Sequence, residues 1–100
     1  MEFTEDSGVW ENKQIVWAKH AEERQQQWQE RFGITREEVE ATVTHPQQVI
    51  LEGEVWVAQI RRGKGLLRVP FVDIGKTRRI LTLYWTNQVK RYWQETLDES

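Results

Sequence analysis

The feature that most restricts the fold of this chain is a change of hydrophobic pattern at His45-Pro46. Before this dipeptide, apolar residues recur at the three- and four-residue spacing of amphipathic helices. After it, short runs rich in Val, Ile and Trp alternate with glycine-containing turns, which is typical of β-strands. Helices followed by strands predict an α+β fold in which the two kinds of element form separate layers.

Two helices are predicted before Pro46. The first covers residues 18–32 and is followed by Gly33, a common residue just after the end of a helix. The second covers residues 36–44, because Thr35 and Glu38 have the spacing of a capping box. Ile34 and Val39 occupy the positions of a hydrophobic staple around the same helix start.

About four strands are predicted after Pro46, joined by turns short enough for an antiparallel meander: residues 48–52, 54–61, 66–74 and 79–85. A short first strand is predicted at residues 13–17, and a closing helix capped by Thr86 at residues 86–95. We expect the helices to cover one face of the sheet. We also expect residues 13–95 to form one domain between an acidic N-terminal arm, residues 1–12, and an acidic tail, residues 96–100.

The charged residues divide the chain more sharply than its net charge of −2 suggests. Residues 1–54 carry five Lys and Arg against twelve Asp and Glu, whereas residues 55–94 carry nine Lys and Arg against one acid, Asp73. A concentration of one sign indicates a polyanion partner, although the two halves of the fold can also neutralise each other. The chain has no cysteine, no cluster of metal ligands and no apolar run of membrane-spanning length, so we expect no metal, no cofactor and a cytoplasmic location.

Strand alternation predicts which basic residues share a face of the sheet. Arg68, Thr82 and Tyr84 are expected on the face away from the apolar side chains, together with either Arg61 or Arg62. Other cations, among them Lys64, Lys76, Arg78 and Arg79, are expected around the turns. Arginines on neighbouring strands repel each other unless an anion lies between them, and a phosphate backbone matches their paired N–H groups. The alternative is that Glu52, Glu54 and Asp73 pair with them.

Several short motifs, in this order, resemble those of the RelE-superfamily ribonuclease toxins, closest to the BrnT-like branch and its uncharacterised relatives. They are His20-Ala21-Glu22-Glu23-Arg24, Gly33-Ile34-Thr35-Arg36-Glu37-Glu38-Val39, Pro46, Gly65-Leu66-Leu67-Arg68-Val69 and Leu81-Thr82-Leu83-Tyr84-Trp85. The resemblance covers about residues 13–95. It implies a metal-independent endoribonuclease that is one half of a toxin–antitoxin pair, with RNA and an antitoxin protein as partners.

The resemblance also implies roles for individual residues. In this chemistry the RNA 2′-hydroxyl attacks the adjacent phosphate, which requires a base, cations around the phosphate oxygens and an acid for the leaving oxygen. Arg68 and either Arg61 or Arg62 would hold the phosphate, and His20 would act as base or acid. Further residues would line the RNA site: Arg24, Tyr92, Lys90 and Arg91, with Lys64, Arg78, Thr82 and Tyr84 around the same face.

Two alternatives remain open beside a ribonuclease. The first is a non-catalytic nucleic-acid-binding or regulatory protein, because aromatic residues lie among the basic ones and stack on unpaired bases: Trp56, Tyr84, Tyr92 and Trp93. The second is a protein-interaction module whose basic sheet meets an acidic partner. Tryptophans at these spacings are also common core residues.

Overall fold

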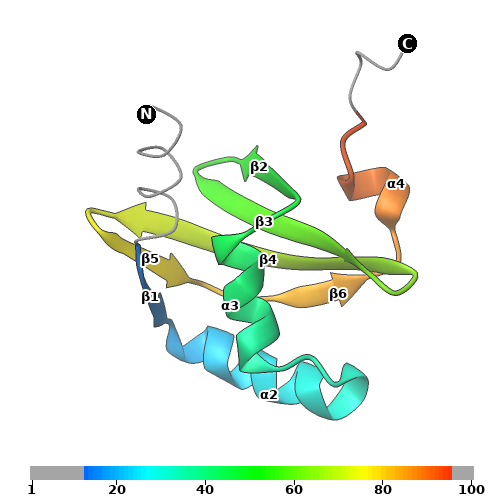
Figure 1. Cartoon of the computed structure of the whole chain (residues 1–100), viewed down its shortest axis with the longest axis horizontal. Coiled ribbons are helices and arrows are strands. Elements are labelled where there is room, and N and C mark those ends of the chain that lie inside the picture. The colour runs from blue at the N-terminus through cyan, green and yellow to red at the C-terminus, as the bar shows by residue number, and fades with distance from the viewer. Residues whose placement is uncertain (1–12, 96–100) are drawn as a thin grey trace.

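A six-stranded sheet lies at the centre of the structure, a computed structural model that describes residues 13–95 (Figure 1). Its strands are β1 (Gln14–Trp17), β2 (Gln48–Glu52), β3 (Val55–Arg62), β4 (Gly65–Ile74), β5 (Thr77–Ile80) and β6 (Tyr84–Thr86). The helices in this part of the chain are α2 (Lys19–Phe32), α3 (Arg36–Thr44) and α4 (Val89–Tyr92). The predicted α+β class is confirmed. The predicted acidic arm and tail, residues 1–12 and 96–100, lie outside the described residues.

The strands follow the order β1-β5-β4-β3-β2, and β6 pairs with the first part of β4. Strands β2 to β5 form the predicted antiparallel meander, whereas β1 is parallel to β5, with Gln14 opposite Thr77. The single strand predicted at residues 79–85 is wrong, because the chain leaves the sheet between β5 and β6. At this break the Leu81 N–H donates to the Pro70 carbonyl over 2.9 Å. Proline has no N–H to return the second bond of the ladder, so pairing is interrupted.

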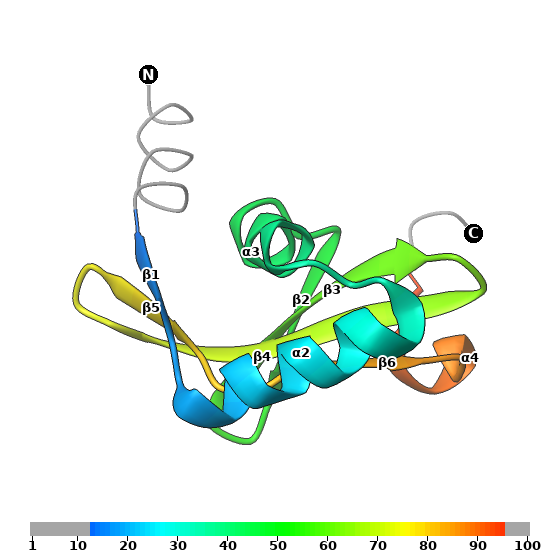
Figure 2. The same cartoon turned by 90° about the horizontal axis from the view of Figure 1, so that it is seen from below.

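The two faces of the sheet differ in what covers them (Figure 2). The helix face carries Ala58, Leu67 and Val69, which form the core with Ala21 of α2 and Val39 of α3. Helix α4 lies on the opposite face, called here the second face, because its Tyr92 contacts Arg68 and accepts a hydrogen bond from Gln59. The expectation that all helices share one side is therefore wrong. The second face carries Gln59 and Arg68, which are directly opposite each other on β3 and β4, with Tyr84 beside Arg68 on β6.

The start of α3 follows the sequence prediction in part. The Glu38 N–H donates to the Thr35 hydroxyl over 3.1 Å, which makes Thr35 the N-cap. Ile34 and Val39 are both fully buried, as the staple predicts. The reciprocal half of the capping box is absent, however, because the Glu38 carboxylate pairs with Arg62 of β3 instead. Helix α3 is thereby fixed to the sheet.

The closing helix is shorter than the predicted range of residues 86–95. Thr86 belongs to β6, and its hydroxyl accepts from the Gln88 N–H, so the helix begins only at Val89. Within residues 13–95, no helix is long and apolar enough to cross a membrane. The single turn of α4 places Tyr92 and Trp93 against the second face, where they contact arginine side chains.

Candidate nucleic-acid interface

Arg68 is the centre of a polar cluster on the second face. Its guanidinium donates to the Gln59 amide oxygen over 2.8 Å, to the Tyr84 hydroxyl over 2.5 Å and to a Glu52 carboxylate oxygen over 2.5 Å. The arginine side chain is 1% exposed, whereas that of Glu52 is 46% exposed. A buried cation requires such partners, because leaving it unpaired costs several kcal/mol. The expected alternative, that Glu52 neutralises an arginine, is therefore observed.

Tyr92 closes this cluster from the side of α4. The Arg68 guanidinium carbon lies 3.9 Å from the centre of the Tyr92 ring, a cation–π contact. The Gln59 amide N–H also donates to the Tyr92 carbonyl over 3.1 Å and to the Gln48 amide oxygen over 2.8 Å. Arg68 is thus covered and partnered by its own chain. The open phosphate clamp expected at Arg68 is not formed in this structure.

The electrostatics of the cluster favour a neutral Tyr84. Burial raises the pKa of the Tyr84 phenol above its ordinary value of 10, although the hydrogen bond and positive charge of Arg68 act in the opposite direction. Tyr84 therefore stays protonated at neutral pH. A protonated hydroxyl both accepts from Arg68 and keeps a donor of its own.

Two other arginines expected at the interface pair with carboxylates on the helix face. Arg62 bonds to Glu38 and also donates to the Phe32 carbonyl over 3.0 Å. Arg78 is 2% exposed and holds Asp73 through two hydrogen bonds of 2.7 and 2.8 Å. Of the two alternatives Arg61 and Arg62, Arg62 therefore does not share the face of Arg68. The expectation that Arg78 lies around a solvated turn is wrong. Each side chain is directed to the helix side of the sheet by strand alternation.

The proposed acid or base His20 lies on the other side of the sheet from Arg68. It is an exposed residue of α2, and its ring nitrogen Nε2 accepts from Arg24 over 3.3 Å. Helix α2 packs on the helix face through Ala21, so His20 and Arg24 do not meet Arg68 or Tyr92. A phosphate held at Arg68 is out of reach of His20. The predicted catalytic set is not assembled.

The structure does bring together a different subset of the predicted residues. Arg61, in register with Leu66, shares the second face with Arg68, which decides between Arg61 and Arg62. Lys64 lies in the β3–β4 turn, and Lys90 and Arg91 lie on α4. Figure 1 shows that turn and α4 at the same end of the molecule. The exposed cations Arg61, Lys64, Lys90 and Arg91 are called the basic end.

The basic end has no internal counter-charge among residues 13–95, where no carboxylate lies within 4.0 Å of its four cationic groups. Two of the cations are held on aromatic rings instead. The Arg61 guanidinium lies 4.5 Å from the centre of the Trp93 ring, and that of Arg91 lies 5.1 Å from Tyr92. Stacking fixes their position but leaves their N–H groups available, apart from a 3.3 Å bond from Arg91 to Gln88.

The remaining cluster residues show what the sequence indicated and what it did not. Thr82 lies in the irregular segment between β5 and β6 and is half-buried, away from any strand position. Gln59, which connects Arg68 to α4, was not among the predicted site residues. The sequence does contain one sign that Gln59 has a special role, because it is a polar residue between Ala58 and Ile60 in an otherwise apolar run. Buried amides of this kind are kept for their hydrogen bonds.

Comparison with known proteins gives no guide to this site: no family model, no curated protein and no solved structure matches the chain. Nor do three or more His, Cys, Asp or Glu side chains gather anywhere in residues 13–95 in a way that would hold a metal ion. The basic end and the Arg68 cluster are therefore the features of the described residues that bear on function.

Proposed function

We propose that the protein binds single-stranded RNA through the basic end. The observation that carries this proposal is the grouping of four exposed cations from β3, the β3–β4 turn and α4 with no carboxylate to neutralise them among the described residues. Neighbouring cations without counter-ions repel each other, so an anion that bridges them is stabilised. A chain of phosphates supplies such an anion at several positions at once.

Aromatic rings at the same place favour a single strand over a duplex. Tyr92 and Trp93 are half-buried, and each lies under a guanidinium of the basic end. Unpaired bases stack on aromatic rings and on arginine planes, whereas the bases of a duplex are not accessible in this way. This binding is independent of sequence to first order, because every base presents a similar face.

Salt dependence tests the proposal directly. If four phosphates are neutralised, the logarithm of the binding constant should fall with the logarithm of salt concentration with a slope of about −2.8. The double variant Arg61→Ala/Arg91→Ala should reduce the slope to about −1.4. Fluorescence anisotropy of a labelled single-stranded RNA measures both quantities.

A matched control removes two cations elsewhere. Lys19 and Arg36 are exposed residues of α2 and α3, outside the basic end. Lys19→Ala/Arg36→Ala changes the net charge by the same amount, so it should leave the slope near the wild-type value. Equal losses in the two double variants, or no salt-dependent binding in the wild type, would refute the proposal.

A metal-independent endoribonuclease with an antitoxin partner is the second candidate, and one observation favours it. Half-exposed Glu52 and Tyr84 adjoin the Arg68 guanidinium, so a carboxylate, a phenol and a cation share one place on the second face. A carboxylate is a suitable base for a 2′-hydroxyl, and a protonated phenol is a suitable acid. This activity requires Tyr92 to move away from Arg68, since the ring covers the guanidinium.

Cleavage in the presence of a metal chelator tests this second candidate. Wild-type protein should cut RNA without metal, and Glu52→Gln should reduce the rate by at least 100-fold, about the effect of losing a general base. Glu54→Gln, which changes a neighbouring exposed carboxylate on the β2–β3 turn, is the matched control. If the wild type leaves RNA intact across pH and salt, the protein is not a ribonuclease, and RNA binding at the basic end is unaffected by that result.

A further inference from the structure

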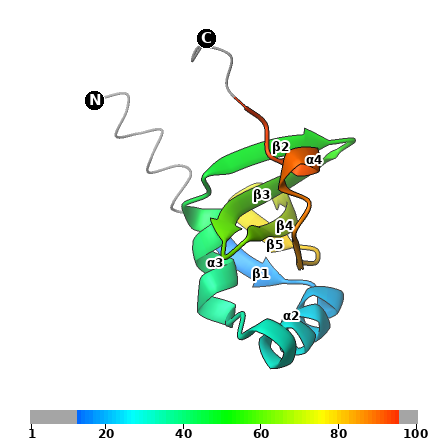
Figure 3. The same ribbon diagram turned by 90° about the vertical axis from the view of Figure 1, so that its right-hand side faces the viewer.

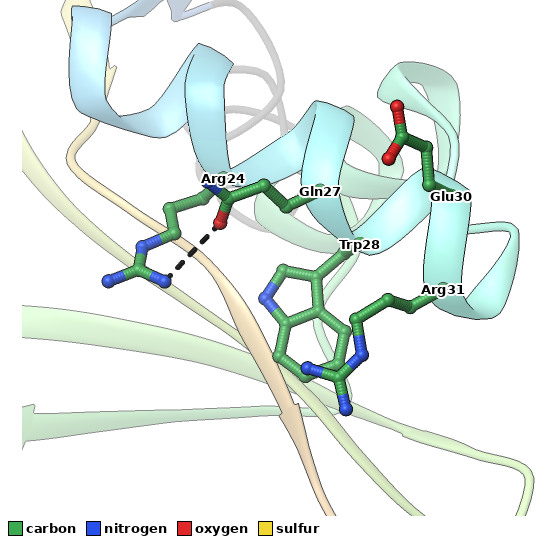
Figure 4. A pocket seen from close by; sticks show the side chains of 5 residues that line it. All are labelled: Arg24, Gln27, Trp28, Glu30 and Arg31. Carbon is green, nitrogen blue, oxygen red and sulfur yellow. Dashed lines mark hydrogen bonds between the residues drawn. The ribbon is translucent and has the colours of Figure 1, made fainter.

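A hollow on the side of α2 combines cationic and aromatic groups outside the basic end. It has a volume of about 280 Å³ and is lined by Arg24, Gln27, Trp28, Glu30 and Arg31 (Figure 4). These residues come from successive turns of α2, on the flank of the helix beside its core-facing stripe. The volume lies just below the range of ligand sites, about 300–1,000 Å³, which suits one small group.

The donors in this hollow lack carboxylate partners among the described residues. Within residues 13–95, the hydrogen-bond acceptors of the Arg24 guanidinium are His20 at 3.3 Å and Gln27 at 3.4 Å, neither of which is a carboxylate. No carboxylate of residues 13–95 lies within ion-pair distance of Arg24 or Arg31, although Glu30 lines the same hollow. Nor does any described residue accept a hydrogen bond from the Trp28 indole N–H. Two guanidinium groups and an indole N–H therefore surround one space, and together they favour an acceptor-rich anion.

The orientation of Arg31 adds a second kind of contact. Its guanidinium carbon lies 4.9 Å from the centre of the Trp28 ring, and Figure 4 shows the two groups overlapping, with Arg24 further along the helix. An arginine fixed on an indole offers its outer plane for stacking by a nucleobase. Arg24 and the Trp28 indole N–H then remain as hydrogen-bond donors for the phosphate that is attached to such a base.

The position of the hollow connects it to the basic end. Arg31 precedes Phe32, whose ring lies 4.8 Å from that of Trp85 on β6, and whose carbonyl accepts from Arg62 beside the β3–β4 turn. Figure 3 looks at this end of the molecule and shows α4 on one side of the ends of β3 and β4 and α2 on the other. A single strand that crosses this end meets both surfaces.

We infer that the α2 hollow is a second subsite that holds one nucleotide of the same RNA strand, with its phosphate at Arg24 and Trp28 and its base on Arg31. This inference rests on the proposed RNA binding at the basic end and extends its footprint onto the helix face. The site recognises the phosphate and a flat base and does not read sequence.

A length series separates the two surfaces. RNA strands of about 4 nucleotides should fill the basic end alone, and strands of about 12 nucleotides should reach the hollow as well. Wild-type protein should bind the longer strand more tightly. Arg24→Ala/Arg31→Ala should lose that gain, about ten-fold. Its salt slope on the longer strand should weaken by about 0.7, the value for one phosphate, while affinity for the short strand stays unchanged. Lys19→Ala/Arg36→Ala is the charge-matched control and should keep the gain.

A second measurement observes the hollow itself. In an amide NMR spectrum, uridine 5′-monophosphate should shift the indole N–H signal of Trp28, assigned by its loss in Trp28→Phe. The shift should disappear in Arg24→Ala/Arg31→Ala. If that variant keeps the wild-type length gain and the indole signal does not respond, the hollow is not a subsite although the basic end binds RNA. If wild-type protein binds neither strand, the proposed function fails as well.

Discussion

At the scale of single residues, Arg68 shows how a strand in the middle of a sheet accommodates a full positive charge. Gln59, Tyr84 and Glu52 each accept a hydrogen bond from it, and Tyr92 covers its plane. Only Glu52 carries the opposite charge, and it is half-exposed. The neutral partners therefore provide much of the solvation that water would otherwise give. In the described structure the main role of Arg68 is therefore to stabilise the fold.

The stability of variants should reflect this role. Arg68→Ala leaves the Gln59 oxygen and the Tyr84 hydroxyl without their donor inside the sheet, so it should lower the free energy of unfolding by about 3 kcal/mol. Arg61→Ala removes an exposed guanidinium on the same face and should cost less than about 1 kcal/mol. Urea unfolding measures both changes in the free energy of unfolding, provided that the slope of this free energy against urea concentration is the same in wild type and variants. Similar costs for the two variants would show that the Arg68 cluster is not a stabilising network.

This expectation changes how a loss of RNase activity in Arg68→Ala would be interpreted. Strand alternation places Arg68 away from the apolar side chains, and from the sequence alone its substitution would therefore be expected to test phosphate binding. Alternation correctly predicts the face and the neighbour Tyr84. It does not reveal that α4 folds back over this face, since the contact between Tyr92 and Arg68 joins residues far apart in the sequence. Glu52→Gln is therefore a better test of ribonuclease activity than Arg68→Ala.

At the scale of elements, local chemistry predicts the starts of α2 and α3 and most strands, whereas long-range pairing decides the rest. The Thr35 cap and the meander follow from neighbouring residues. The parallel pairing of β1 with β5 joins residues 14–17 to residues 77–80, and no local pattern indicates it. The break between β5 and β6 depends on Pro70 of another strand, so hydrophobic alternation alone runs through it.

The approach of β6 to β4 gives an element-scale prediction. A methyl group on Gly65 would lie 2.1 Å from the Thr86 carbonyl oxygen and 2.6 Å from the Trp85 ring. Backbone on one side and a packed indole on the other leave little room to adjust, so Gly65→Ala should cost about 2–3 kcal/mol and displace β6. Gly63→Ala, in open space but at a φ of 62°, should cost about 1 kcal/mol.

Urea midpoints and the near-ultraviolet circular dichroism of the tryptophans, among them Trp85 against Gly65, distinguish these two glycine substitutions. Loss of tertiary signal in Gly65→Ala, but not in Gly63→Ala, is expected if close packing is the cause. Equal destabilisation with an unchanged tryptophan signal would show that β6 adapts to the methyl group, and that its pairing with β4 is loose.

At the scale of the whole molecule, the basic second half of the sequence is not one basic surface. Arg62, Arg68 and Arg78 are each engaged by a carboxylate, so three of the nine cations of residues 55–94 are neutralised inside the fold. The others separate into the basic end and the pair Lys76 and Arg79 near the opposite β4–β5 turn (Figure 1). A count along the sequence cannot make this distinction, because ion pairing depends on which face each strand position occupies.

This separation allows local and overall charge to be tested against each other. Arg61→Glu/Arg91→Glu and Lys76→Glu/Arg79→Glu lower the net charge by the same amount, but only the first pair lies on the basic end. Salt at 0.15 M screens exposed charges beyond about 8 Å, whereas the molecule extends 42 Å along its longest axis. RNA affinity at that salt concentration should therefore fall by more than about 100-fold in the first variant and less than about three-fold in the second. Anisotropy titrations that give equal losses would assign the binding to net charge, and they would remove the reason to place RNA at the basic end.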